Sequence, residues 1–202
     1  MKIKGCSLFV ALLASASMAG CAFVDQKVDL SYERTVGAKG GAGDIMIAKP
    51  VEMQSLTKKG ENVWVIGSVK NTYGVRTADT VTDNNLGDWV VRALTQELTD
   101  AGYLISHVDK LPPGIPKGLD VTVLRVWVDQ DPGFWSVGAI SDVQFNIDIW
   151  KNGTKVKTVN IAGKGDDRSI AGTAETKGLS LKKALQAAMR QAVPELIRTL
   201  EQ

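Results

Sequence analysis

The sequence predicts an α+β domain in which a mostly antiparallel sheet of about six strands carries two amphipathic helices packed on one face. Two patterns support this prediction. Apolar residues recur at helical spacing over residues 86–101 and 180–200. Before and between these segments, short apolar runs are separated by Gly, Pro and Asn turns, which is typical of strands. The chain has 202 residues, enough for one substantial core.

Four strands are predicted where apolar residues run almost without interruption, at residues 44–48, 63–69, 103–105 and 119–128. Residues 71–82 are predicted to form a loop. A fifth strand alternates apolar with polar residues, so that one face is buried and the other is wet. Its apolar members are Val143, Phe145, Ile147 and Ile149.

Asn152-Gly153 predicts a tight hairpin after the alternating strand, because a type I′ turn needs positive φ at both central residues. The sixth strand follows that turn. Simple pairing outward from the turn would point Val159 and Ile161 toward water. We therefore expect a β-bulge near Lys157, since one extra residue restores their inward direction.

The two helices have recognisable ends. The first is expected to begin at Asn84 or Asn85, either of which can cap it, and to end at Gly102, which suits a left-handed position. The second is expected to begin at Ser180 and to be bent or restarted by Pro194.

The N-terminus has the order of a secretory signal peptide over residues 1–20: a basic start, the short apolar run 8–14 and small residues. That run is too short to span a bilayer, which takes about 20 residues. The signal ends in Met18-Ala19-Gly20-Cys21, which resembles the lipobox of bacterial lipoproteins. The resemblance implies cleavage between Gly20 and Cys21, with a diacylglycerol and an N-acyl chain attached to Cys21.

Residues 21–42 are predicted to be a lipidated flexible tether, because four glycines fall within 37–43. Such a tether would give roughly 25 Å of reach. The same glycines lack the Gly-Lys-Ser/Thr ending of a phosphate-binding loop, so a linker is favoured. Residues 43–202 are then the single globular domain, which the lipoprotein resemblance places in the periplasm.

Charge and cysteine content restrict the partners. Without Lys2 and Lys4 of the signal peptide, 22 basic and 22 acidic side chains remain, which argues against nucleic acid as a partner. Membrane attachment is therefore expected through the lipid, and several acyl chains anchor stably. Ala22, in place of the Asp that marks inner-membrane retention in the lipoprotein family, points to the periplasmic face of the outer membrane of a Gram-negative bacterium.

Few residues suggest catalysis. His107 is the only histidine and Cys6 leaves with the signal peptide, so a His-rich metal site and a Cys-His nucleophile are excluded. Asp129 and Asp131 could divide acid and base roles in a hydrolase, but solvated loop charges explain them better. We predict no enzyme activity, no metal and no cofactor apart from the lipid on Cys21.

Phe134 and Trp135 are the candidate partner-binding residues. Both lie in a Pro-Gly turn, where two large aromatic side chains are hard to bury together, and exposed aromatics often anchor partners. The alternative is that this loop folds back and Trp135 covers the open end of the sheet.

The order of elements after the lipobox resembles the YajG-like family of bacterial outer-membrane lipoproteins, which is poorly characterised. The most specific shared part is Gly102-Tyr103 after the first helix, followed by the strand 119–128, the hairpin and the closing helix. The resemblance implies a fold and a location but supplies no catalytic residues. It favours a non-enzymatic lipoprotein that binds, scaffolds or assembles an envelope protein partner. The alternative is an auxiliary lipoprotein subunit of an ABC-type lipid or envelope transport system.

Overall fold

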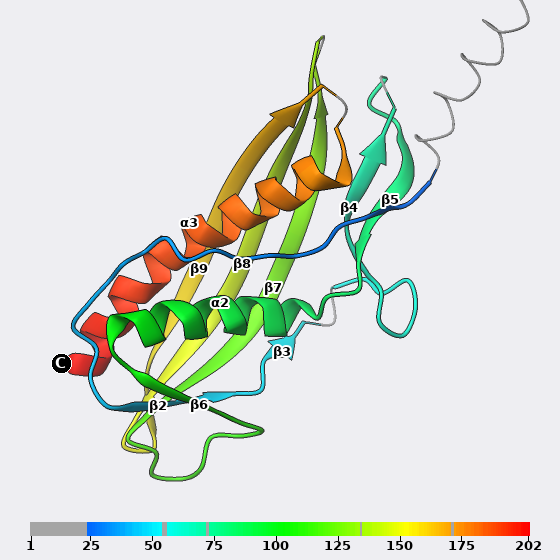
Figure 1. Ribbon diagram of the computed structural model, residues 1–202. Coiled ribbons are helices and arrows are strands. Elements are labelled where there is room, and N and C mark those ends of the chain that lie inside the picture. The colour runs from blue at the N-terminus through cyan, green and yellow to red at the C-terminus, as the bar shows by residue number, and fades with distance from the viewer. Residues whose placement is uncertain (1–23, 54–55, 72, 134, 171) are drawn as a thin grey trace, which may run out of the picture.

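The computed structural model describes residues 24–53, 56–71, 73–133, 135–170 and 172–202. The described chain folds into one nine-stranded sheet with both helices on the same face (Figure 1). In chain order the elements are β1 (Gln26–Lys27), β2 (Asp44–Ala48), β3 (Val51–Glu52), β4 (Trp64–Lys70), β5 (Arg76–Thr82), α2 (Leu86–Ala101), β6 (Leu104–Val108), β7 (Lys117–Pro132), β8 (Val137–Lys151), β9 (Thr154–Ser169) and α3 (Ala174–Glu201). Neither helix is long and apolar enough to cross a membrane.

The sheet is mixed, so the prediction of a mostly antiparallel sheet of six strands is wrong. Strand β7 pairs with β8 antiparallel on one side, and β2, β3 and β4 follow one another parallel to it on the other. On that second side, β6 pairs parallel to β2 and β1 pairs parallel to β5, whereas β9 is the edge strand beyond β8. Parallel neighbours need long crossover connections, so their pairing leaves no local pattern in the sequence.

The hairpin between β8 and β9 follows the sequence prediction. Asn152 and Gly153 have φ values of 50° and 75°. Register changes beside the turn, because Ile149 pairs with Lys157 whereas the next residue of β8 pairs with Lys155. The bulge near Lys157 is thereby confirmed, and it turns Ile161 into the core.

Helix α2 has the predicted ends. The Asn85 side chain accepts a hydrogen bond from the Asp88 amide at 2.8 Å, and Gly102 adopts the left-handed conformation with φ of 115°. Helix α3 begins earlier than Ser180, because Thr173 caps it. Pro194 lies inside α3, and the helix continues past it.

Ser180 is buried within α3 and bonds to the sheet instead of capping the helix. Its hydroxyl lies 2.7 Å from the Ser141 hydroxyl and 3.0 Å from the carbonyl oxygens of Ala139 and Gly165. A small polar residue inside a helix can make such bonds only if the helix lies very close to the strands.

Two glycines of β9 allow this close approach. A Cβ atom at Gly163 would lie 2.1 Å from the Ala184 carbonyl oxygen, and one at Gly165 would lie 2.2 Å from that of Ser180. The α3 backbone therefore occupies the space that side chains would take on β9. The buried apolar side chains of β8 complete the core beneath the helix.

The N-terminal segment packs against the domain, which corrects the prediction of a flexible tether over residues 21–42 for the part described. Strand β1 pairs with β5, and Val28 is buried in the core. The buried Glu97 carboxylate of α2 accepts hydrogen bonds from the Tyr32 hydroxyl and from the Thr35 amide, the latter at 2.8 Å. Figure 1 shows this segment running between α2 and α3 and then on to β2. The packed domain therefore begins well before residue 43.

Substituting Gly163 tests the close contact between α3 and β9. Gly163→Ala should destabilise the fold by about 1–3 kcal/mol, because the new methyl group must displace the helix backbone. For a domain of this size that corresponds to a fall in melting temperature of about 2–10 °C. Thermal unfolding followed by circular dichroism measures the change.

Gly60→Ala is the matched control. Only Val63, at 3.9 Å, lies near a Cβ atom at position 60. This variant should therefore stay within about 0.5 kcal/mol of wild type. Equal stability of the two variants would contradict the packing described for α3.

Candidate binding cleft

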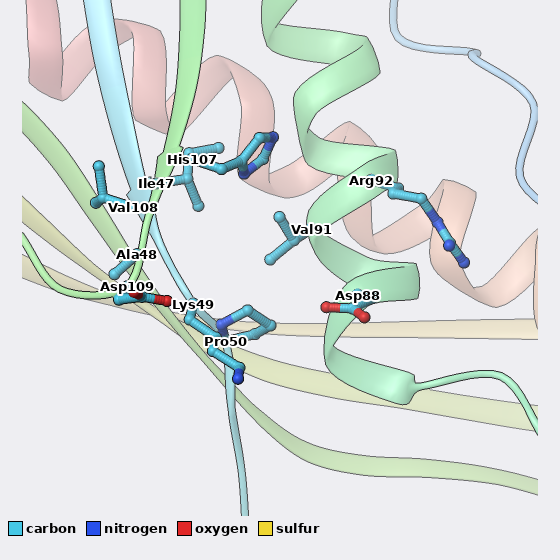
Figure 2. Close-up of a pocket in the computed structure, with 10 residues that line it drawn as sticks. All are labelled: Ile47, Ala48, Lys49, Pro50, Asp88, Val91, Arg92, His107, Val108 and Asp109. Atoms are coloured by element: carbon cyan, nitrogen blue, oxygen red, sulfur yellow. The ribbon is translucent and has the colours of Figure 1, made fainter. Parts of the chain in front are cut away.

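A cleft of about 720 Å³ lies between α2 and the two strands β2 and β6. Its floor is apolar and includes the buried side chains of Ile47 and Val91. Figure 2 shows Val91 and Asp88 directed from α2 toward the strands, with Pro50 and His107 on the opposite side. Pockets of this kind, with an apolar floor and a few polar groups, are the usual form of ligand and peptide sites.

The start of α2 is fixed against the chain that follows β2. A Cβ atom at Gly87 would lie 2.8 Å from Pro50 Cγ, so only glycine permits this contact. The Gly87 amide, which belongs to the first turn of the helix, also donates to a Glu52 carboxylate oxygen at 3.2 Å. The carboxylate satisfies an amide that has no partner within the helix.

The rim of the cleft carries charged side chains that are available to a ligand. Lys49, Asp88, Arg92 and Asp109 are exposed, and none forms an ion pair within the described parts of the chain. His107 is exposed as well, with its Nε2 atom 3.4 Å from the Thr95 hydroxyl. In Figure 2 the Arg92 side chain extends away from the strands, so it could reach only a ligand that overhangs the helix.

The cleft adjoins a free edge of the sheet. Strand β6 is last in the strand order, and among the described strands it pairs only with β2. The outer backbone groups of an edge strand can pair with an added strand. The cleft and this edge together therefore suit an extended segment of polypeptide.

Of the residues predicted from the sequence to be functional, the structure describes only Trp135, which does not line the cleft. Gly20, Cys21 and Phe134 are outside the described residues. Trp135 is 85% exposed in the turn between β7 and β8, so it does not cover the end of the sheet.

The two aspartates considered for hydrolysis are held by separate cations. Asp129 accepts hydrogen bonds from Lys70 at 2.6 Å and from the Ser68 hydroxyl at 3.1 Å, whereas Asp131 pairs with Arg168. Burial raises the pKa of Asp129, but the hydrogen bonds from Lys70 and Ser68 outweigh burial and hold it below its usual value. A carboxyl group with a lowered pKa is a poor proton donor at neutral pH.

Lys177 of α3 is a buried titratable group that the sequence analysis missed. It is 1% exposed, and its ammonium donates to the Thr80 hydroxyl at 2.7 Å and to the Ser68 carbonyl at 3.0 Å. Burial lowers the pKa of Lys177 to about 8. Lys177 lies three residues before Ser180 and therefore on the same, buried face of the helix. This helical spacing is the only sequence feature that could have indicated that Lys177 is buried.

The described residues contain no cluster of three or more His, Cys, Asp or Glu side chains suited to a metal ion. The charged and titratable groups that line the cleft are two aspartates, a histidine, a lysine and an arginine, and they come from different elements. Its chemistry suits recognition through hydrogen bonds and charge, with an apolar floor that excludes water.

No family model and no curated protein sequence matches this chain. Among solved structures, a Xanthomonas campestris protein of the DUF330 family superposes with a TM-score of 0.57 at 12% identity, covering 88% of this chain and 94% of that one. The two share a fold. At this identity the likeness extends no further.

Two weaker likenesses cover different shares of the chain. A candidate neuraminyllactose-binding hemagglutinin homologue from Helicobacter pylori has a TM-score of 0.41 at 10% identity, covering 87% of this chain and 98% of its own. A candidate lipoprotein from Caulobacter crescentus has a TM-score of 0.30 at 15% identity, covering 46% and 73%.

The buried Lys177 predicts a pH dependence of stability. In the folded state the Lys177 ammonium loses its proton above pH about 8. In the unfolded chain the same side chain keeps its proton up to its ordinary pKa of 10.5. Because the unfolded state then binds more protons, stability should rise with pH in this window, by on the order of 1 kcal/mol per pH unit. Urea unfolding at several pH values between about 8 and 10.5 measures how the free energy of unfolding changes with pH. The Lys177→Met variant should lack this increase.

Lys164→Met provides the control, because Lys164 is exposed on β9. It should keep the wild-type slope. If Lys177→Met keeps that slope too, the titration belongs to another group.

Proposed function

We propose that this chain is a lipid-anchored lipoprotein of the bacterial cell envelope whose domain is a non-enzymatic binding module. The observation that carries the proposal is the sequence Met18-Ala19-Gly20-Cys21 directly behind a basic and apolar start. Cys21 would carry the diacylglycerol and N-acyl chains. Ala22 favours the outer membrane, and resemblance to the YajG-like lipoproteins favours the same location.

The cleft supports the role of a binding module. Its exposed charges have no ion-pair partners in the described chain, and its floor is apolar. The free edge of β6 lies beside it. An extended segment of an envelope protein, paired with β6 and with one side chain over Val91, is the partner that suits these features.

The engaged state of the acidic residues supports a non-enzymatic role. Asp129 is held by Lys70 and Ser68, and Asp131 by Arg168. Ion pairing of both carboxylates favours a structural role for them over acid–base chemistry on a substrate.

Lipidation is tested by the mass of the N-terminal peptide of the protein purified from membranes. Wild type should begin at Cys21 with acyl chains attached, and Cys21→Ser should lack them and leave the membrane fraction. Cys6→Ser is the matched control, because position 6 lies in the signal peptide and its loss should change nothing. An N-terminal peptide without lipid in the wild type would refute the anchor.

Partner binding is tested by a photo-crosslinking residue in place of His107 in living cells. We expect a protein adduct that Asp88→Asn weakens and that a crosslinker at Lys164, which lies on the exposed side of β9 toward the other end of the sheet, does not give. If the adduct is a subunit of an ATP-driven transporter, the protein is an auxiliary subunit of that system. Identical adducts at both positions would refute a role for the cleft.

A further inference from the structure

Three connections meet at one end of the sheet. Strand β4 runs parallel to β7 with Gly67 opposite Val128, so the β4–β5 and β7–β8 turns leave the sheet at the same end. Strand β9 ends there too, because Ser169 pairs with Val137. Figure 1 shows the tips of these strands pointing the same way.

The described apolar side chains at this end are strongly exposed. Tyr73 is 89%, Trp135 85% and Ile170 90% exposed, and Val75 is 59% exposed. These four residues form what we call the apolar end. They come from three separate connections and protrude from the sheet. Soluble proteins seldom leave such a set uncovered without a binding role.

The first described residues lie beside β5, on the side of the sheet that leads to the apolar end. Strand β1 runs parallel to β5, with Gln26 opposite Thr80, and the Asp79 amide donates to Asp25 at 3.0 Å. Cys21 lies four residues before Asp25, a span of at most about 14 Å. Val75 of the apolar end likewise lies four residues before Asp79, which bonds to Asp25. The chain from Asp25 back to Cys21 is therefore long enough for the Cys21 sulfur to reach the apolar end.

The charges next to the apolar end are neutralised in pairs. Lys70 pairs with Asp129, and Arg168 with Asp131. Arg76 pairs with Asp79 in the same way. A surface whose charges are paired gains little electrostatic binding energy from anionic lipids. Binding to a membrane would therefore depend on burial of the apolar side chains.

We infer that the apolar end lies in the headgroup region of the membrane that holds the Cys21 lipid, so that the domain stands upright on its anchor. This inference rests on the proposed lipidation. Tyr and Trp favour the membrane interface, because the ring is apolar and its polar group stays hydrated. Protruding tips on separate loops fit a deformable lipid surface better than a shaped protein pocket.

An upright domain places the cleft far from the bilayer. Ile47 beside the cleft pairs with Leu119, thirteen residues before the end of β7 at Pro132. At about 3.3 Å per residue this separates the cleft from the apolar end by roughly 40 Å. The proposed partner would then bind well inside the periplasm.

Fluorescence quenching by lipids tests the inference on the full lipidated protein. Cys21 is acylated in the proposal and Cys6 is removed, so one introduced cysteine can be labelled with an environment-sensitive fluorophore. Labels at Tyr73→Cys and Ile170→Cys, in phosphatidylcholine vesicles, should shift to shorter wavelength and be quenched by nitroxide-bearing lipids. Leu104→Cys is the control, since Leu104 is 71% exposed at the start of β6, beside the opposite end of β7.

The outcomes separate this inference from the anchor. Quenching at positions 73 and 170 but not at 104 supports it. Vesicle-bound protein with no quenching at 73 and 170, or with equal quenching at all three sites, overturns it and leaves the anchor standing. A chain without N-terminal lipid that stays off the vesicles overturns both. A crosslink from Tyr73 to an envelope protein instead of lipid would assign the apolar end to that partner.

Discussion

The close contact of α3 with β8 and β9 is the constraint on which the rest of the structure depends. Strands β4 and β5 are joined to β7 by one ladder pair, Gly67 with Val128, and by side-chain bonds such as that from Lys70 to Asp129. Helix α3 also connects these strands to β8 and β9. Ser180 bonds to β8 and β9, and Lys177 bonds to β4 and β5 one turn earlier on the same helix. Without glycines on β9, the helix would stand too far from the strands to make either set of bonds.

Contacts with α2 and α3 explain why the N-terminal segment packs against the domain. The segment runs between the two helices, and each contributes a contact: Glu97 from α2, and Gln186 from α3, whose amide donates to the Glu33 carbonyl at 2.9 Å. These bonds fix the path from β1 to β2. The position of α2 also defines one wall of the cleft.

The sequence analysis was correct for elements whose defining residues are close together in the chain. Helix α2 has an apolar stripe and both caps within its own sequence, and the β8–β9 hairpin has its turn residues and an alternating strand. Strand β5 was missed because Arg76–Thr82 is mostly polar, and it is buried by β1 and β4, which come from distant segments. Ser180 matched a cap by residue type, although its environment in α3 depends on glycines in β9.

The cleft could not be predicted for a related reason. It collects residues from three segments, 47–50, 88–92 and 107–109, none of which forms a motif alone. Parallel pairing of β2 with β6 and the contact of Pro50 with Gly87 bring them together. By contrast, the lipobox is a contiguous pattern, so the sequence alone motivates the anchor.

The ordered N-terminal segment changes what an anchor on Cys21 would mean. A flexible tether of about 20 residues would allow roughly 25 Å of reach and free rotation of the domain. Only three residues separate Cys21 from Asp25, which bonds to the Asp79 amide and to Lys59. A lipid attached there restricts both the height and the tilt of the domain. A partner would therefore meet the cleft at a defined distance from the membrane, and binding would lose less orientational freedom than it would on a long tether.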